Sequence, residues 1–331
     1  MLFENIEQIK LLEGPTPLQK IPRFGASIHL PNLYIKRDDH MLLGLGGNKL
    51  RNLEFWLAEA LKQEADLLVA AGGLQSNQCR LTAAAAAKVG LQCLLIHNDD
   101  QPAVPEGNGF LNYLLGAETI YLGKISEEER GRQVVTILDR LKKQGRRPYL
   151  IGDAGLGALA YAKAAEELAQ QSLLLERPIN QVVIVGAMCV TAGGFLYGTS
   201  LCNAPYHVHV ISVEYPLEIM KSAIEQVWQK AINRTGTIPK LHYTAFSSFY
   251  DTYLGEDYAI PTEEAWKAMK SLAQMEGIFL EQVYSAKTMA GLIDLQRRGI
   301  LKEEDCVCII HTGGYGALFT QNKLLINTFQ L

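Results

Sequence analysis

The sequence predicts an α/β protein in which a parallel β-sheet is covered by helices on both faces. Short apolar segments with strand character alternate with longer helical patterns through most of the 331 residues. Most of the strand segments are apolar throughout, which is typical of strands that are buried on both faces. Glycine-rich turns join several strand segments to the helix that follows, as expected for βα connections of a parallel sheet.

Seven segments are predicted strands because they are short, apolar and bounded by turn residues. In chain order they are 67–71, 92–96, 119–122, 148–151, 182–185, 207–213 and 306–311. The predicted helices share helical periodicity or strong helix formers, with a cap or a glycine at one end. They are 77–89, 108–115, 126–144, 157–170, a helix from about 193, 216–232, 262–276 and one after Gly314.

Length and composition indicate a globular protein of about two domains, at roughly 150 residues per domain. No repeat or long linker separates them, so we place the boundary near residues 150–160. The 31 Lys and Arg residues against 35 Asp and Glu give a net charge of −4 without a basic cluster, which argues against nucleic acid as a partner. We expect no membrane span, because no apolar run reaches about 18 residues.

The cysteines and histidines give no metal signal. None of the six cysteines has zinc-site spacing, and we expect Cys306 and Cys308 to be buried free thiols. His207 and His209 could share a face of a strand, but no third ligand is near them in sequence. The first ten residues carry Glu4 and Glu7 and do not resemble a secretory signal, so we expect a cytoplasmic protein.

Four glycine-rich turns are candidates for a ligand site, because ligands of open α/β sheets bind at the carboxyl ends of strands. The turns are 44–49, 72–77, 186–194 and 311–314. Each places backbone N–H groups at a helix start, where an anion can bind. Taken alone, each is also explained as an ordinary βα turn.

Lys49 lies at such a helix start. The positive field there disfavours an ammonium and lowers the pKa of a lysine, which suits an amine that forms a Schiff base. A solvated lysine remains the alternative interpretation.

Six motifs together resemble the D-cysteine desulfhydrase / 1-aminocyclopropane-1-carboxylate deaminase family. They are GGNK (46–49), QSN (75–77), GAE (116–118), EGI (276–278), VYSAKTMAG (283–291) and HTGG (311–314). They follow the family's order from about GPTPL (14–18) to the end of the chain. The resemblance implies the tryptophan-synthase-β-like fold (fold type II), with two open, twisted, mostly parallel sheets flanked by helices. It also implies a large discontinuous domain (1–48 and 155–331), a small α/β domain (49–154), a homodimer and the cofactor pyridoxal 5′-phosphate.

The resemblance also implies a role for each matching residue. Lys49 matches the lysine that binds the cofactor covalently and later moves the Cα proton of the substrate. Asn77 matches the asparagine that bonds the phenolic oxygen of the cofactor. Ser76 matches the serine beside the substrate, and the Gln75–Asn77 turn would take the substrate carboxylate. Tyr258 and Tyr284 match two tyrosines on the substrate side of the ring.

Ser285 and Thr312 favour the desulfhydrase branch. The deaminase branch has glutamate and leucine at these positions, and the desulfhydrase branch has small hydroxyl residues. A carboxylate partner keeps the pyridine nitrogen protonated, whereas a hydroxyl leaves it closer to neutral. We therefore expect Ser285 beside that nitrogen, Thr312 in the cofactor site, and elimination from D-cysteine or a related small D-amino acid. Thr312 could also cap the helix that follows it.

The phosphate region departs from the family. We expect the stretch from Gly186 to Gly194, with Thr191 inside it, to hold the phosphate. Its residues include Ala187, Met188, Cys189 and Val190, where the family is rich in Ser and Gly. A β-branched valine resists the positive φ that glycine allows.

Two further departures concern side chains near the cofactor. Asn52 replaces a phosphate-facing lysine, and Gln78 replaces a histidine. A non-catalytic relative, or one that binds another ligand, therefore remains an alternative, as does a deaminase.

Overall fold

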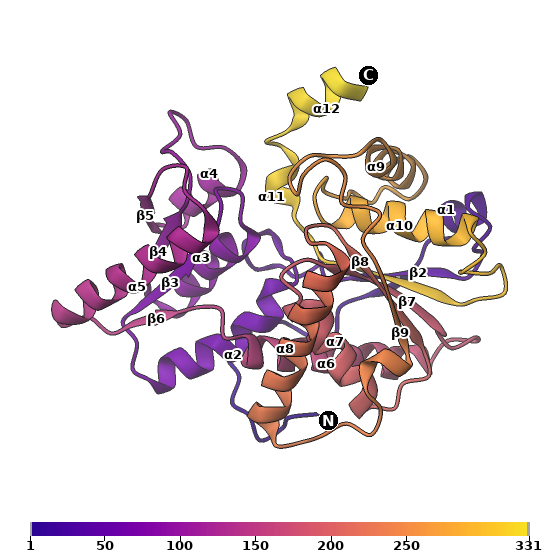
Figure 1. The fold of residues 1–331 in the computed structure, drawn as a ribbon, viewed down its shortest axis with the longest axis horizontal. Helices are drawn as coiled ribbons and strands as arrows, with labels where there is room; N and C mark the ends of the chain where they lie inside the picture. Colours follow the sequence, from indigo (N-terminus) through magenta and orange to yellow (C-terminus); the bar gives the residue numbers. More distant parts are fainter. Residues whose placement is uncertain (1, 330–331) are drawn as a thin grey trace.

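The computed structural model describes residues 2–329 and has two β-sheets with helices around them (Figure 1). The strands are β1 (Leu18–Lys20), β2 (Leu33–Arg37), β3 (Leu67–Ala71), β4 (Gln92–His97), β5 (Glu118–Tyr121), β6 (Pro148–Leu150), β7 (Gln181–Gly186), β8 (His207–Ser212), β9 (Ser247–Tyr250) and β10 (Val307–His311).

The helices follow the alternation that the sequence predicts. They are α1 (Pro22–Ser27), α2 (Lys49–Lys62), α3 (Asn77–Val89), α4 (Gly107–Leu114), α5 (Glu127–Lys143), α6 (Ala154–Ser172), α7 (Val190–Leu201), α8 (Leu217–Thr235), α9 (Glu263–Glu276), α10 (Ser285–Arg297), α11 (Tyr315–Leu318) and α12 (Asn322–Phe329). Short 3₁₀ turns cover Leu43–Leu45 and Tyr243–Ala245. Helix α7 begins at Val190, earlier than the expected start near 193, and this places its first turn directly after β7.

The larger sheet has six strands in the order β1-β2-β10-β7-β8-β9, and the smaller has four in the order β5-β4-β3-β6. All neighbouring strands are parallel except β1, which is antiparallel to β2. All four strands of the smaller sheet fall between residues 49 and 154. The grouping of these four strands into a separate sheet supports the prediction of two domains. The exact domain boundaries remain a prediction.

Side chains of the larger sheet alternate between two cores. Val182 and Ile184 of β7 face a core shared with α2, α6, α7 and α8. Val183 and Val185 face a second core with α1, α9 and α10. Because both faces are apolar, this sheet is buried between two helical layers, and its strand ends are free to form a site.

The structure also contains elements that the sequence did not predict: β1, β2, β9, α1 and α10. Strand β2 carries Lys36 and Arg37, both buried in ion pairs, so its pattern is not that of an apolar strand. Helix α10 has no side-chain cap at Tyr284. Cys306 and Cys308 are buried free thiols, as predicted.

Candidate active site

A cavity of about 610 Å³ lies at the carboxyl ends of both sheets. Its wall combines the start of α2, the β3–α3 turn, the end of β4, the first turn of α5, the β7–α7 turn, the end of β8 and the loop before α10. Each is a segment that follows a strand or opens a helix, which is where α/β sheets place ligands. All four predicted turns contribute to the wall of the cavity. The turns 72–77, 186–194 and 311–314 contribute residues 72–77, 187–191 and 312–313, and the turn 44–49 contributes Asn48 and Lys49.

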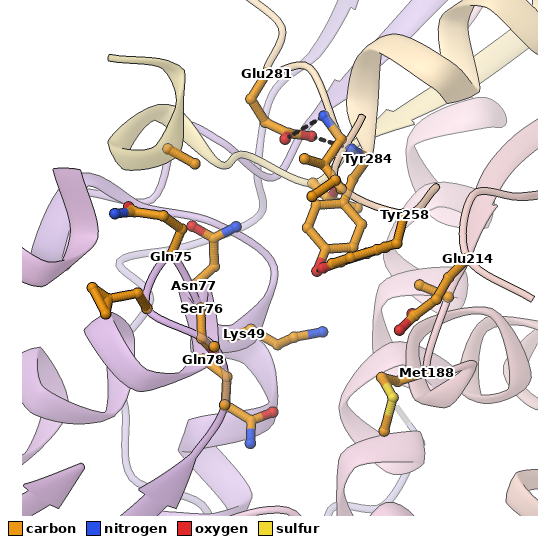
Figure 2. Close-up of a pocket in the computed structure, with 18 of the residues that line it drawn as sticks. Lys49, Gln75, Ser76, Asn77, Gln78, Met188, Glu214, Tyr258, Glu281 and Tyr284 are labelled. Atoms are coloured by element: carbon orange, nitrogen blue, oxygen red, sulfur yellow. Dashed lines mark hydrogen bonds between the residues drawn. The ribbon is translucent and has the colours of Figure 1, made fainter. Parts of the chain in front are cut away.

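Lys49 is the first residue of α2, and its amine points into the cavity (Figure 2). The turn before it needs glycine, because Gly46 has a φ of 66° and an added Cβ would lie 2.3 Å from the Asp39 carbonyl oxygen. Asn48 N–H donates to the Thr312 carbonyl at 3.0 Å, which joins the start of α2 to the end of β10. Burial lowers the pKa of the Lys49 amine to about 8, and the Glu214 carboxylate acts in the opposite direction. An amine with this pKa is partly neutral near physiological pH and can act as a nucleophile or base.

The Gln75–Asn77 turn forms the wall beside Lys49 and leads into α3 (Figure 2). Ser76 is the N-cap of α3, and its Oγ accepts a hydrogen bond from Cys79 N–H at 3.3 Å. Asn108 of α4 fixes the turn from outside, because its Nδ2 donates to the Gln75 carbonyl at 2.7 Å and to Asn77 Oδ1 at 3.0 Å. Because the Asn77 side-chain oxygen accepts this hydrogen bond, the Asn77 amide N–H₂ group can donate to a ligand in the cavity.

Tyr258 and Tyr284 line the cavity together, and their hydroxyl groups are hydrogen-bonded to each other. Their rings meet edge to face, with centroids 5.6 Å apart. Burial and then the charge of Glu214 raise the pKa of the Tyr284 hydroxyl, so it is protonated at neutral pH.

The β7–α7 turn is a candidate anion site. Residues 187–191 line the cavity, and the N-cap of α7 is Cys189, which makes no side-chain capping bond. The first three N–H groups of α7 therefore have no partner within the helix. Thr191 Oγ1 accepts from Asn48 Nδ2 at 3.0 Å, so this turn is tied to the start of α2. The donor set fits a phosphate group.

The positive φ in this turn lies at Cys189, with a value of 60°, and not at Val190. Val190 therefore does not have to adopt the positive φ that a β-branched residue resists. Val190 is instead the first helical residue, and its side chain packs beside Gly157 of α6. The left-handed conformation is rare for a residue with a Cβ and marks the turn as locally strained.

Three predicted contact residues do not line the cavity. Gly186 packs under Met220, where a Cβ would lie 2.6 Å from the sulfur. Gly194 packs inside α7 against Ala158 of α6, where a Cβ would lie 2.4 Å from a backbone oxygen. The Ser285 hydroxyl is hydrogen-bonded to the Glu281 backbone, at 2.8 Å from its nitrogen. The structure thus gives these three residues packing and positioning roles.

Thr312 lines the cavity, and the residue that caps α11 is Gly314, which corrects the alternative in which Thr312 caps that helix. Asn52 does not line the cavity, because its Nδ2 donates to the Gly157 carbonyl at 3.1 Å inside the protein. Gln78, in contrast, lines the wall beside Ser76. Within residues 2–329 no cluster of three metal-ligating side chains is found, and the rings of His207 and His209 lie 4.9 Å apart on β8. None of the helices in that range has the length and apolar content needed to cross a bilayer.

Two acidic residues of the site were missed from the sequence. Glu214 follows β8, lines the cavity and has a pKa of about 7, raised by burial and then by Glu127. The sequence did offer one signal for Glu214, because this residue directly follows a predicted strand and ligands bind at the carboxyl ends of strands. Glu281 is fully buried, and its carboxylate accepts backbone N–H groups of Val283, Tyr284 and Ser285 at 2.6–2.8 Å. Glu281 thereby holds the segment that carries Tyr284 in place. No motif or spacing in the sequence predicts this role of Glu281.

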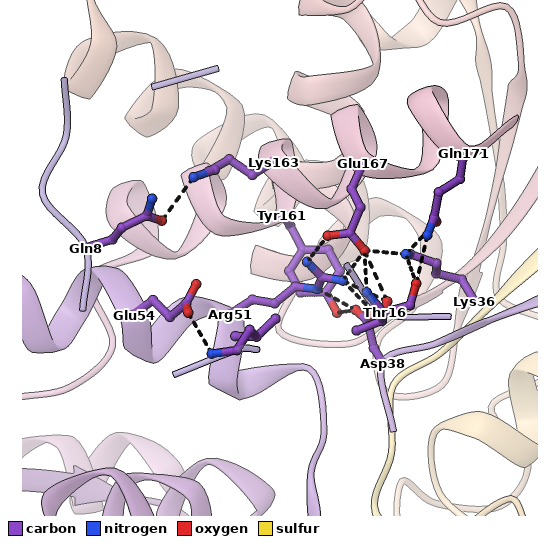
Figure 3. A network of polar contacts seen from close by, with 11 residues as sticks. Gln8, Thr16, Lys36, Asp38, Arg51, Glu54, Tyr161, Lys163, Glu167 and Gln171 are labelled. Carbon is purple, nitrogen blue, oxygen red and sulfur yellow. Dashed lines mark hydrogen bonds and ion pairs between the residues drawn. The ribbon is translucent and has the colours of Figure 1, made fainter. Parts of the chain in front are cut away.

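A buried polar network lies beneath α2 (Figure 3). We define the α2 network as Thr16, Lys36, Asp38, Arg51 and Glu167. Arg51 binds both Asp38 oxygens, at 2.7 and 2.9 Å, and Glu167 at 2.9 Å. Lys36 forms an ion pair with Glu167 and donates to the Thr16 carbonyl at 2.7 Å. The two cations of the network, Lys36 and Arg51, compensate the charges of its two carboxylates. Arg51 joins this network to α2 only two residues after Lys49.

Comparison with known proteins agrees with this site. The model of the family "Pyridoxal-phosphate dependent enzyme" matches residues 9–313. D-cysteine desulfhydrase of Serratia proteamaculans (strain 568) is 36% identical over 320 residues, which cover 94% of this chain and 95% of the relative. D-cysteine desulfhydrase of Klebsiella pneumoniae (strain 342) is 36% identical over 340 residues, which cover 98% and 100%.

Among solved structures, a protein described as an ACC deaminase homologue superimposes with a TM-score of 0.89 at 31% identity, covering 97% of this chain and 96% of that one. The family match spans most of the chain, includes Lys49 and the turns around the cavity, and agrees with a fold type II architecture. The chain therefore belongs to the family of pyridoxal-phosphate dependent enzymes.

Proposed function

We propose that this protein is a pyridoxal-phosphate dependent carbon–sulfur lyase that acts on D-cysteine or a related small D-amino acid. With D-cysteine and one water molecule, the products are pyruvate, ammonia and sulfide. The observation that carries the proposal is the Lys49 amine, which has a lowered pKa and lies in one cavity with the Gln75–Asn77 turn. The names of the two 36% identical relatives support D-cysteine as the substrate.

In this proposal the residues that line the cavity have different roles in binding and catalysis. The backbone N–H groups of the Gln75–Asn77 turn hold the substrate carboxylate, and Ser76 lies beside the substrate. Lys49 Nζ takes the proton from Cα. Tyr258 and Tyr284, joined by their hydroxyl groups, bound the side of the cavity opposite the turn and limit access of water (Figure 2).

The cofactor would be held by residues that already have free donors. The first turn of α7, with Thr191, would bind the phosphate, and the Asn77 amide would bind the phenolic oxygen. Thr312 would lie beside the ring, and Lys49 would hold the cofactor covalently. When bound, the cofactor withdraws electrons from Cα and so makes its proton more acidic.

Ser285 favours a lyase over a deaminase. Loss of a thiol from Cβ needs a deprotonated Cα and a good leaving group. Opening of a cyclopropane ring needs a stronger electron sink, which a carboxylate beside the ring nitrogen would provide. Ser285 stands where the deaminase branch has that carboxylate, and its hydroxyl is bound to Glu281.

The test supplies the purified protein with pyridoxal 5′-phosphate and measures products from three compounds. We expect sulfide and pyruvate from D-cysteine, little from L-cysteine, and no 2-oxobutyrate from 1-aminocyclopropane-1-carboxylate. Release of 2-oxobutyrate without sulfide would favour the deaminase. A protein that gives neither product and takes up no cofactor would favour the non-catalytic alternative.

We also propose a cytoplasmic homodimer whose partners are small amino acids, with neither nucleic acid nor membrane as a partner. All six cysteines are free thiols, which supports a reducing compartment. The absence of a basic cluster from the sequence argues against nucleic acid. Sedimentation of the purified protein gives its oligomeric state directly.

A further inference from the structure

The proposed function gives no role to Glu214, an acidic residue that lines the cavity. Strands β7 and β8 are parallel neighbours in which Gly186 pairs with Ser212. Glu214, two residues beyond that pair, therefore lies beside the β7–α7 turn. Its carboxylate enters the cavity from the wall opposite Lys49 (Figure 2).

The other acidic groups of the cavity are engaged elsewhere. Glu127 pairs with Arg130 at 3.1 Å. Asp99 accepts the Leu74 N–H at 2.8 Å, and Glu281 accepts three backbone N–H groups. Glu214 is the acidic residue whose charge acts on the Lys49 amine.

The surroundings of Glu214 include charged groups of both signs. The titratable groups that face it are Lys49 of α2, Glu127 and Arg130 of α5, Tyr215 beside it, Cys189 at the start of α7 and Tyr284 at the start of α10. Burial and Glu127 raise its pKa, whereas Tyr215, Lys49 and Arg130 lower it. Burial raises the pKa of the Cys189 thiol and of the Tyr215 and Tyr284 hydroxyls, so these three groups are neutral at neutral pH.

We propose that Glu214 is the counter-ion of Lys49 and stabilises the ammonium that forms whenever this lysine takes up a proton. The inference rests on the proposed role of Lys49 as the group that moves the Cα proton. In that step the Cα–H bond breaks, an N–H bond forms at Nζ, and the electron pair of the broken bond stays with the substrate carbon. A fixed carboxylate across a buried site stabilises the positive charge that develops on Nζ.

Glu214 acts through Lys49, so it is a positioning residue. Its presence keeps the amine charged to a higher pH than burial alone would allow. Removal of the carboxylate should therefore lower the pH at which Lys49 loses its proton.

The test measures how fast the full-length protein, stripped of cofactor, attaches pyridoxal 5′-phosphate at Lys49 between pH 6 and 9. Samples are reduced with borohydride at timed intervals, and the modified peptide is quantified by mass spectrometry. The variants are Glu214→Gln, which keeps the shape of the side chain, and Glu218→Gln, a matched control with a largely exposed side chain four residues later. We expect the midpoint of the rate profile to fall by roughly one pH unit in Glu214→Gln and to stay unchanged in Glu218→Gln.

An unshifted midpoint in a folded Glu214→Gln protein would overturn the inference. If that variant does not fold, Glu214→Ala removes the same charge, and the same shift or its absence decides the question. The proposed function fails separately, because a wild-type protein that releases no sulfide from D-cysteine could still show the attachment profile and its shift.

Discussion

Two clusters of charge lie on either side of the first turn of α2, and they differ in how their charges are compensated. In the α2 network every carboxylate has a cation in direct contact. Burial raises the pKa of Asp38, but Arg51 and Lys36 outweigh it and hold the pKa below its usual value. In the cavity, burial lowers the pKa of Lys49 to about 8 and raises that of Glu214 to about 7. The carboxylates of the first cluster are held in the ionised form, whereas Lys49 and Glu214 can exchange protons near neutral pH.

This difference separates groups that maintain the structure from groups that do chemistry. Displaced pKa values in a cleft mark functional groups, because a proton can move at little cost near neutral pH. The α2 network lies two residues from Lys49 and holds the helix from which the amine projects. The contrast predicts that damage to one cluster affects stability and damage to the other affects reactivity.

The largest effect is expected for Lys49→Ala. This change removes the amine, so turnover and the visible absorption of bound cofactor should both disappear. The thermal midpoint should change little, because a partly exposed lysine at a helix start contributes little to packing. Absorption spectra, sulfide release and calorimetry measure these quantities, with Lys62→Ala at the exposed end of the same helix as the control. Full activity in Lys49→Ala would refute the assignment.

Asp38→Asn should have the largest effect on stability. It leaves Arg51 without its main partner in a buried site, and loss of one partner of such a pair costs about 3–5 kcal/mol. Urea unfolding at pH 7 measures this cost, with exposed Asp139→Asn as the control. Because the pKa of Asp38 is lowered in the folded state, its contribution is present above the unfolded pKa and is lost as pH falls through the folded pKa. Equal stability of the variant and the wild-type protein at pH 7 would contradict the structural role.

Asn52→Lys should strengthen cofactor binding. Asn52 and Val190 both lie against Gly157, so a lysine at position 52 would bring a cation toward the start of α7. A charge-assisted contact contributes roughly 1.5–3 kcal/mol, and after the cost of burial we expect about a tenfold gain in cofactor affinity. Equilibrium titration with pyridoxal 5′-phosphate measures the gain, with Asn52→Gln as the uncharged control. An unchanged affinity would mean that a lysine at position 52 does not reach the phosphate.

Glu214→Gln should have the smallest effect of the four substitutions. It should raise the free energy of unfolding, whereas Asp38→Asn should lower it. A carboxylate whose pKa is raised on folding destabilises the folded protein above that pKa and has no such effect below its unfolded pKa. The variant should therefore be more stable at pH 8, by about 1 kcal/mol after allowance for solvent screening, and unchanged near pH 4. Denaturant unfolding at the two pH values checks this, and a loss of stability at pH 8 would contradict the raised pKa.

The same contrast explains what could be predicted from the sequence. The alternation of strands and helices, the turns predicted at 72–77 and 186–194, and the position of Lys49 at a helix start all depend on local pattern. The structure confirms the alternation and brings Lys49 and parts of both turns to one cavity, although α7 begins at Val190 and not near residue 193. Strand β2 was missed because Lys36 and Arg37 are buried by partners that are far away in sequence. Glu281 and Asn108 were missed for a similar reason, since their roles exist only once α10 and α4 reach the cavity.

Borohydride reduction tests most directly whether the Lys49 amine holds the cofactor. The purified protein is incubated with pyridoxal 5′-phosphate, reduced, digested and analysed by mass spectrometry. We expect one modified peptide, with the added mass on Lys49. Modification of a different lysine, or none after saturation with cofactor, would contradict it.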